Sequence, residues 1–129
     1  MLPDAPSVCV LRVNMNITEV QAFFIEFTAT FVLFLTVAGA VDVQNENKHD
    51  STPARIGLMI AGLVFAAEPF TGAGLNPARA LSPAVLYNIW TSHWLYHFAP
   101  YAGMATAGIL YRFVLDSNEK NSLYSFVNK

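Results

Sequence analysis

The sequence predicts an all-α membrane protein with three transmembrane helices and one re-entrant half-helix. Charged residues make up only 12% of the 129 residues, whereas a typical soluble protein has roughly 25%. Only Glu26, Glu68 and Arg79 interrupt the apolar stretches, because the other charges gather at the ends of the chain and in one connection. A fourth apolar stretch is broken by glycine and proline. These observations indicate a chain that sits mainly in lipid.

The three predicted spans cover 20–41, 52–72 and 94–115. The first has 22 residues and one charge, Glu26, and a hydrocarbon core of about 30 Å needs roughly 20 helical residues. The second has a shorter apolar run, so it crosses only if its ends are included. The third contains Pro100 and small residues that permit close helix contact. We therefore expect two regular spans and one kinked span.

The stretch between the second and third spans predicts a short helix. Asn76 is a favoured N-cap, and Pro77 suits the first helical position. A helix over 77–88 reaches only about halfway across the bilayer core. We expect Gly72–Leu75, which precedes it, to have an extended backbone with carbonyl groups free to accept hydrogen bonds. Such a re-entrant segment is tolerated only where protein encloses it or water reaches it.

Positive charges predict the orientation of the spans. Lysine and arginine occur in the connection Asp42–Arg55 and in the C-terminal tail, which covers 116–129, so we expect both regions to be cytoplasmic. Residues 1–19 then form an outer connecting loop. The sequon that begins at Asn16 lies in this loop, on the side where glycosylation takes place.

Several classes of function lack support in the sequence. The net charge of −2 provides no basic surface for nucleic acid. The single cysteine, Cys9, excludes an internal disulfide and a multi-cysteine metal site. No grouping of nucleophile, base and acid is present, so we expect no enzyme, catalytic residue, metal ion or cofactor.

The segment Gly72–Ala84 reads GAGLNPARALSPA and resembles the second Asn-Pro-Ala motif of the major intrinsic proteins, the aquaporin family. The segments Glu26–Thr30 and His93–Tyr96 strengthen this resemblance, which covers 20–115. It implies an aquaporin-like half, the second of two inverted three-helix repeats. It also implies a missing N-terminal repeat, a homotetramer when complete, and a passive channel for water and small neutral solutes such as glycerol or urea.

The Asn-Pro-Ala segment has its own physical logic. Asn76 can cap the half-helix and donate its amide into a pore, while the helix N-terminus carries roughly half a positive charge. That field repels a cation and accepts the oxygen of a neutral water. We expect the carbonyls of Gly72, Gly74 and Leu75 to line the same path.

The resemblance assigns roles to further residues. It implies that Arg79 lies in a selectivity constriction, where it acts as a hydrogen-bond donor and as a barrier to cations. It also implies that Val64 and Ala73 occupy two other positions of this constriction. Strict water channels of the family usually carry His where Val64 stands, so a wider and less polar filter is implied. Pro77 and Ala78 support the half-helix.

Glu26 and Arg79 each have a second interpretation. A charge within a span is either paired or functional. We favour Glu26 as a buried carboxylate that holds the re-entrant backbone, over a pore-lining one. The alternative for Arg79 is a structural salt bridge. His97 departs from the family's usual Trp, and we expect it to be a packing residue rather than a pH sensor.

Two functions of different classes remain open. In the first, the chain is half of the wall of a channel. In the second, it is a non-conducting half-channel that binds or regulates intact relatives in the lipid bilayer.

Overall fold

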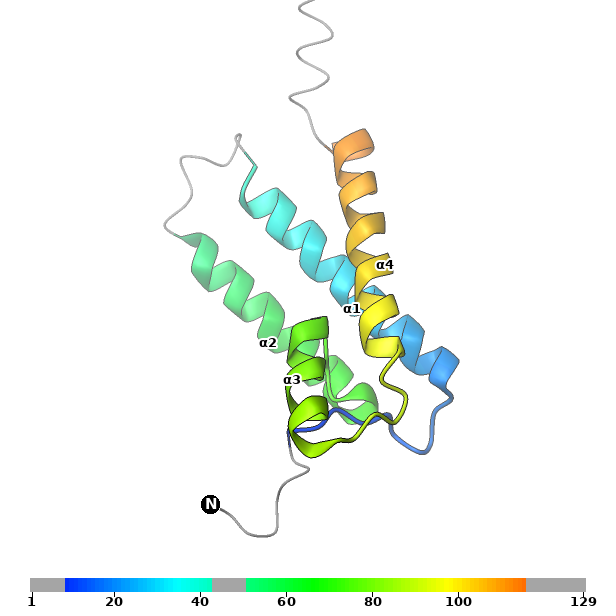
Figure 1. The fold of residues 1–129 in the computed structure, drawn as a ribbon. Helices are drawn as coiled ribbons and strands as arrows, with labels where there is room; N and C mark the ends of the chain where they lie inside the picture. Colours follow the sequence, from blue (N-terminus) through cyan, green and yellow to red (C-terminus); the bar gives the residue numbers. More distant parts are fainter. Residues whose placement is uncertain (1–8, 43–50, 116–129) are drawn as a thin grey trace, which may run out of the picture.

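The computed structural model describes residues 9–42 and 51–115, and in this part of the chain all regular secondary structure is helical, with no strand. The all-α prediction is therefore confirmed. The elements in chain order are α1 (Glu19–Ala40), α2 (Thr52–Thr71), α3 (Pro77–Tyr87), α4 (Leu95–Leu110) and a π-helical turn (Tyr111–Leu115). Figure 1 shows α1 and α2 side by side and α4 crossing α1, and the short α3 contacts α4.

Helix α1 begins with a capping box. The Thr18 hydroxyl accepts from the Gln21 amide at 3.3 Å, and the Gln21 side chain accepts from the Thr18 amide at 2.9 Å. Both bonds satisfy donors that a helix N-terminus otherwise leaves unpaired. The helix continues for 22 residues, within one residue of the predicted bounds.

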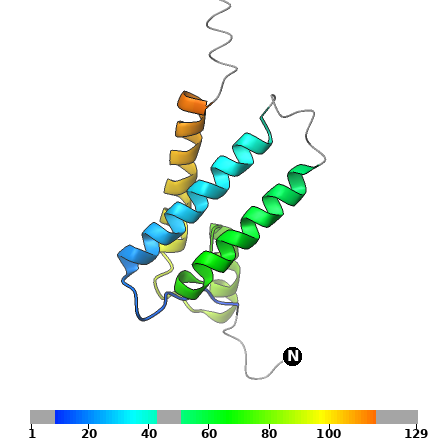
Figure 2. The ribbon, with the colours of Figure 1, turned by 180° about the vertical axis from the view of Figure 1, so that it is seen from behind.

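Helix α1 packs against both α4 and α2, and the view from behind in Figure 2 shows α1 and α2 running alongside each other. The contact with α4 is close at Gly103, where an added Cβ would lie 2.5 Å from the Phe27 carbonyl oxygen. Glycine at this position lets the two backbones approach each other.

Helices α1 and α2 are each long and apolar enough to cross a membrane. Large apolar side chains such as Leu58 and Phe65 are exposed along α2, as expected for a surface that faces lipid or another protein segment. Helix α4 has 16 residues, and the rest of the predicted third span forms the π-helical turn.

Parts of the predicted topology lie outside the described residues. These are the start of the outer loop, 1–8, most of the connection between the first two helices, 43–50, and the tail, 116–129.

The chain reverses between α2 and α3. Helix α2 ends at Gly72, which has φ 77° and whose amide donates to the Glu68 carbonyl at 3.0 Å. This left-handed geometry suits glycine and closes the helix. Helix α3 then runs for 11 residues to Tyr87, and its C-cap, Asn88, is again left-handed at φ 52°. The short helix thus occupies the predicted half-helix position.

Candidate functional site

A buried carboxylate on α1 holds the turn between α2 and α3. Glu26 is 0% exposed. Its Oε1 accepts from the Gly74 amide at 2.8 Å and from the Thr71 hydroxyl at 2.6 Å, and its Oε2 accepts from the Leu75 amide at 2.8 Å. The hydrogen bonds expected between Glu26 and the re-entrant backbone are therefore present. All three hydrogen-bond partners of the carboxylate are donors, so its burial is compensated.

The backbone of this turn is not extended, and that expectation is wrong. Gly72, Ala73 and Leu75 have φ angles of 77°, 51° and 55°. Successive amides of an extended strand point in opposite directions, whereas the amides of Gly74 and Leu75 both reach Glu26. Left-handed residues turn consecutive N–H groups toward one side and form a concave anion-binding nest. The anion in this nest is the Glu26 side chain.

The side chain of Tyr96 fixes the same turn. The Tyr96 hydroxyl, on α4, donates to the Thr71 carbonyl at 2.7 Å, and Tyr96 is 1% exposed. A Cβ on Gly74 would lie 2.9 Å from the Tyr96 ring and 3.2 Å from Glu26 Oε2, so no larger residue fits here. Thr71 was not predicted as a site residue, although a hydroxyl directly before a helix-ending glycine can indicate a side chain that bonds to the turn.

The segment before α1 is bonded to the C-terminal end of α2. Asn14 donates its amide to the Phe70 carbonyl at 2.8 Å and its side chain to the Pro69 carbonyl at 3.0 Å. These carbonyls lie at the C-terminal end of α2, where no following helical turn supplies amides to donate to them. Asn16 is exposed two residues later, and its amide donates to the Asn14 side chain at 2.9 Å.

Asn76 begins α3 as predicted. Its Oδ1 accepts from the Ala78 amide at 2.9 Å, and within the described ranges no group accepts from its Nδ2. Pro77 occupies the first turn, where the missing N–H of proline removes no helical hydrogen bond. The exposed amide of Asn76 therefore lies at the positive end of the helix dipole.

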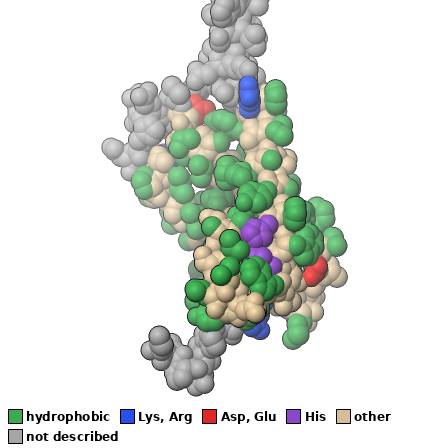
Figure 3. Space-filling view, in the orientation of Figure 1, with side chains coloured by type: hydrophobic (Ala, Val, Ile, Leu, Met, Phe, Trp, Pro, Cys, Tyr) green, Lys and Arg blue, Asp and Glu red, His purple; other side chains and the backbone are tan. Residues whose placement is uncertain are grey.

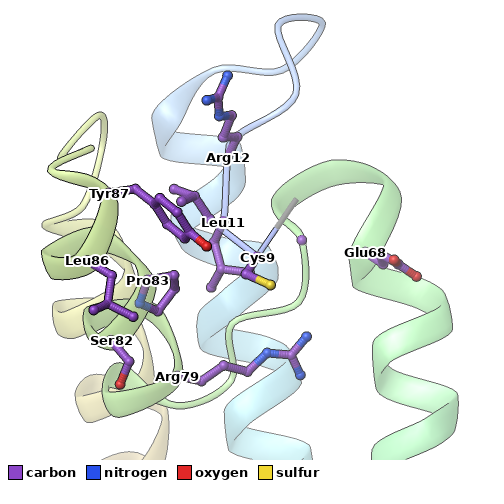
Figure 4. A pocket seen from close by; sticks show the side chains of 11 residues that line it. Cys9, Leu11, Arg12, Glu68, Arg79, Ser82, Pro83, Leu86 and Tyr87 are labelled. Atoms are coloured by element: carbon purple, nitrogen blue, oxygen red, sulfur yellow. The ribbon is translucent and has the colours of Figure 1, made fainter. Parts of the chain in front are cut away.

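Two hollows meet at Arg79. The larger has a volume of about 710 Å³, and Gly72 and Glu68 are among its lining residues. In Figure 4, Arg79 extends from α3 toward α2, while Glu68 points away. The smaller, of about 530 Å³, is lined by Gly74, Leu75, Asn76, Pro77, Ala78 and other residues, and Arg79 lines it too.

Arg79 is exposed, and in the part of the chain that the structure describes no carboxylate forms an ion pair with it. The smaller hollow also contains Thr30, which is 2% exposed. Its hydroxyl has no hydrogen-bond partner among the described residues. Arg79 can therefore still donate hydrogen bonds toward the hollows, whereas the Thr30 hydroxyl is a buried group without a partner in the described part of the chain.

The two remaining predicted constriction residues do not line either hollow. Ala73 is 0% exposed, and Val64 is half-buried. However, Ile60 lines the smaller hollow and Glu68 the larger. Since residues four apart share a helix face, Val64 lies on the same stripe of α2, between the two.

The sequence is similar to that of known proteins along most of its length. Residues 4–111 match the model of the major intrinsic protein family. A probable aquaporin TIP3-2 of Oryza sativa subsp. japonica is 42% identical over 101 residues, which covers 78% of this chain and 38% of the relative. Probable aquaporin PIP2-5 of Arabidopsis thaliana is 38% identical over 108 residues, with the same coverage.

Aquaporin-4 of Rattus norvegicus is 36% identical over 106 residues, which covers 81% of this chain and 32% of the relative. The chain thus spans less than two fifths of the length of these relatives. The match to the family model covers well over half of the chain, and the described part folds into helices around a re-entrant Asn-Pro-Ala turn. The chain belongs to the major intrinsic protein family.

Proposed function

We propose that this chain forms one half of the wall of a passive membrane pore for water and small neutral solutes. The observation that carries the proposal is the junction of two hollows at Arg79, with the N-terminus of α3 and Asn76 beside it. Family membership supports a channel rather than an enzyme.

The proposed selectivity is electrostatic. The start of α3 contributes roughly half a positive charge, and Arg79 adds a full one. Both repel a cation in a weakly screened passage. A neutral water can instead accept a hydrogen bond from the exposed side chain of Asn76 or Arg79.

Val64 is proposed as a filter residue beside Arg79. Its place between Ile60 and Glu68 on one stripe of α2 supports this role, because those two residues line opposite hollows. An apolar side chain there tolerates the carbon backbone of a polyol. The role proposed for Ala73 rests on the motif alone.

The opposing wall of the pore is proposed to be an N-terminal repeat. The chain spans less than two fifths of the relatives named above, and the exposed apolar faces of its helices offer contact surfaces for lipid and for such a repeat. We further propose a homotetramer, a cytoplasmic Asp42–Arg55 loop and tail, and a glycan on Asn16.

The test joins this chain to the N-terminal half of rat aquaporin-4, in place of the matching C-terminal segment. Proteoliposomes with the joined protein should shrink rapidly under osmotic stress, while those with the 129-residue chain alone should match empty liposomes. A joined protein that is folded and inserted but conducts no water would contradict the proposal. If the chain alone instead alters the permeability of co-reconstituted aquaporin-4, it acts as a regulatory half-channel.

A further inference from the structure

Two histidines lie one helical turn apart where α4 begins. His93 precedes the helix, but its carbonyl already accepts from the Tyr96 amide at 3.2 Å, and the His97 amide donates to the Trp94 carbonyl at 3.1 Å. This helical turn places the two imidazoles on the same face. Figure 3 shows the described histidines together on one side of the molecule, among hydrophobic side chains.

The ring nitrogens of the pair converge. His93 Nε2 and His97 Nε2 lie 2.9 Å apart and share a hydrogen bond, which a bound ion would replace, while the ring centroids are 4.7 Å apart and the planes meet at 70°. The nitrogens are closer than the ring centres, so each Nε2 faces the space between the rings.

This spacing fits the bite of a metal ion. Two nitrogens that each lie about 2.0–2.1 Å from a metal are roughly 2.9 Å apart at a right angle and roughly 3.3 Å apart at a tetrahedral angle. Imidazole is a preferred ligand of zinc, copper and nickel. Two histidines four residues apart on a helix face form a known half of such sites.

The surroundings leave the pair accessible to an ion. Both imidazoles are half-buried, and Trp90 packs edge-on against His93 at 5.1 Å. The nearby carboxylate of Glu19 accepts from Trp94 at 3.2 Å and from the Ser92 hydroxyl. Exposed tryptophans are typical of the membrane interface, which aqueous ions reach. Among the described residues no third His, Cys, Asp or Glu joins the pair.

From this geometry we infer that His93 and His97 bind one divalent transition metal ion of the zinc class through their Nε2 atoms. Water completes the coordination. The ion would link the α3–α4 connection to the first turn of α4. The site lies apart from the hollows that Arg79 joins, because neither histidine lines them, and it is independent of the proposed pore.

The test uses the full chain labelled with ¹⁵N-histidine, in phosphatidylcholine nanodiscs, titrated with Zn²⁺. All samples carry Cys9→Ser, which removes the single thiol. The chain contains three histidines, and we expect two Nε2 resonances to shift together and saturate at one Zn²⁺ per chain. This experiment needs no histidine variant, so its result does not depend on whether a variant folds.

Three single variants assign the site. His93→Gln and His97→Gln should each abolish the saturable shift of the remaining partner, while His49→Gln, the matched control, should keep both shifts. The inference is overturned if no shift saturates, if His49 is one of the two shifted residues, or if saturable binding persists in a folded His97→Gln chain.

Discussion

Replacing Glu26 by Gln tests the central contact of the site, because Gln keeps the shape but offers one acceptor oxygen instead of two. Glu26 accepts from three donors, two on Oε1 and one on Oε2. If the Gln oxygen takes the position of Oε1, its NH₂ group faces the Leu75 amide. If it takes the position of Oε2, its NH₂ group faces the Gly74 amide and the Thr71 hydroxyl. In either orientation one backbone N–H loses its acceptor and meets a donor.

The loss of one acceptor sets the expected loss of stability. A buried donor without a partner costs about 1–3 kcal/mol, and the lost hydrogen bond contributes about 1 kcal/mol more. We therefore expect Glu26→Gln to lower the free energy of unfolding by about 2–4 kcal/mol. The matched control is Glu68→Gln, since this carboxylate on α2 is exposed and its substitution should change stability by less than about 0.5 kcal/mol.

Unfolding can be followed by titrating micelles of the chain with sodium dodecyl sulfate and recording tryptophan fluorescence. Trp94 is a suitable reporter, because its ring stacks on Phe23 of α1 at 6.0 Å and separates from it when α1 and α4 part. If Glu26→Gln and Glu68→Gln unfold at the same midpoint, the reasoning that Glu26 anchors the turn is refuted.

Three further substitutions address packing and selectivity. Gly103→Ala should destabilise the chain by about 1–3 kcal/mol, since its Cβ meets the Phe27 carbonyl at 2.5 Å, whereas Gly108→Ala, with open space around it, should not, as denaturant titration would reveal. In a complete channel, Arg79→Val should raise proton or cation leak more than it changes water flow, measured with a pH-sensitive dye in liposomes; unchanged exclusion would locate the barrier elsewhere. Val64→His should preserve water flow and reduce glycerol uptake in swelling assays, and equal uptake by the mutant would remove Val64 from the filter.

The sequence predicts the elements of this fold well because local chemistry sets their ends. Asn76 and Pro77 are adjacent residues whose preferences for the N-cap and the first helical position agree, and α3 begins there. Gly72 can adopt the left-handed geometry that closes α2. The lack of charge predicts the long apolar helices, since this depends on composition rather than on contacts.

The details of the site depend on contacts between distant residues, and the pattern alone does not contain them. Glu26 and Gly74 are 48 residues apart in sequence, and the left-handed backbone at Ala73 and Leu75 exists because two amides converge on that carboxylate. From the residues alone, a Gly-rich segment of this kind favours an extended chain as readily as a nest. Only the partner on α1 decides between them.

The same carboxylate explains how an unfavourable backbone persists next to the hollows. A left-handed residue with a side chain costs roughly 1–2 kcal/mol, and the turn contains two such residues in succession around a glycine, Ala73 and Leu75. Glu26 offsets this by accepting hydrogen bonds from two backbone amides of the turn and from the Thr71 hydroxyl. Because Glu26 accepts only from Thr71, Gly74 and Leu75 among the described residues, the amide of Asn76 and the side chain of Arg79 are not committed to it. One buried anion therefore holds the turn while the positive groups of α3 face the hollows, and Glu68, the carboxylate that lines the larger hollow, points away from Arg79 (Figure 4).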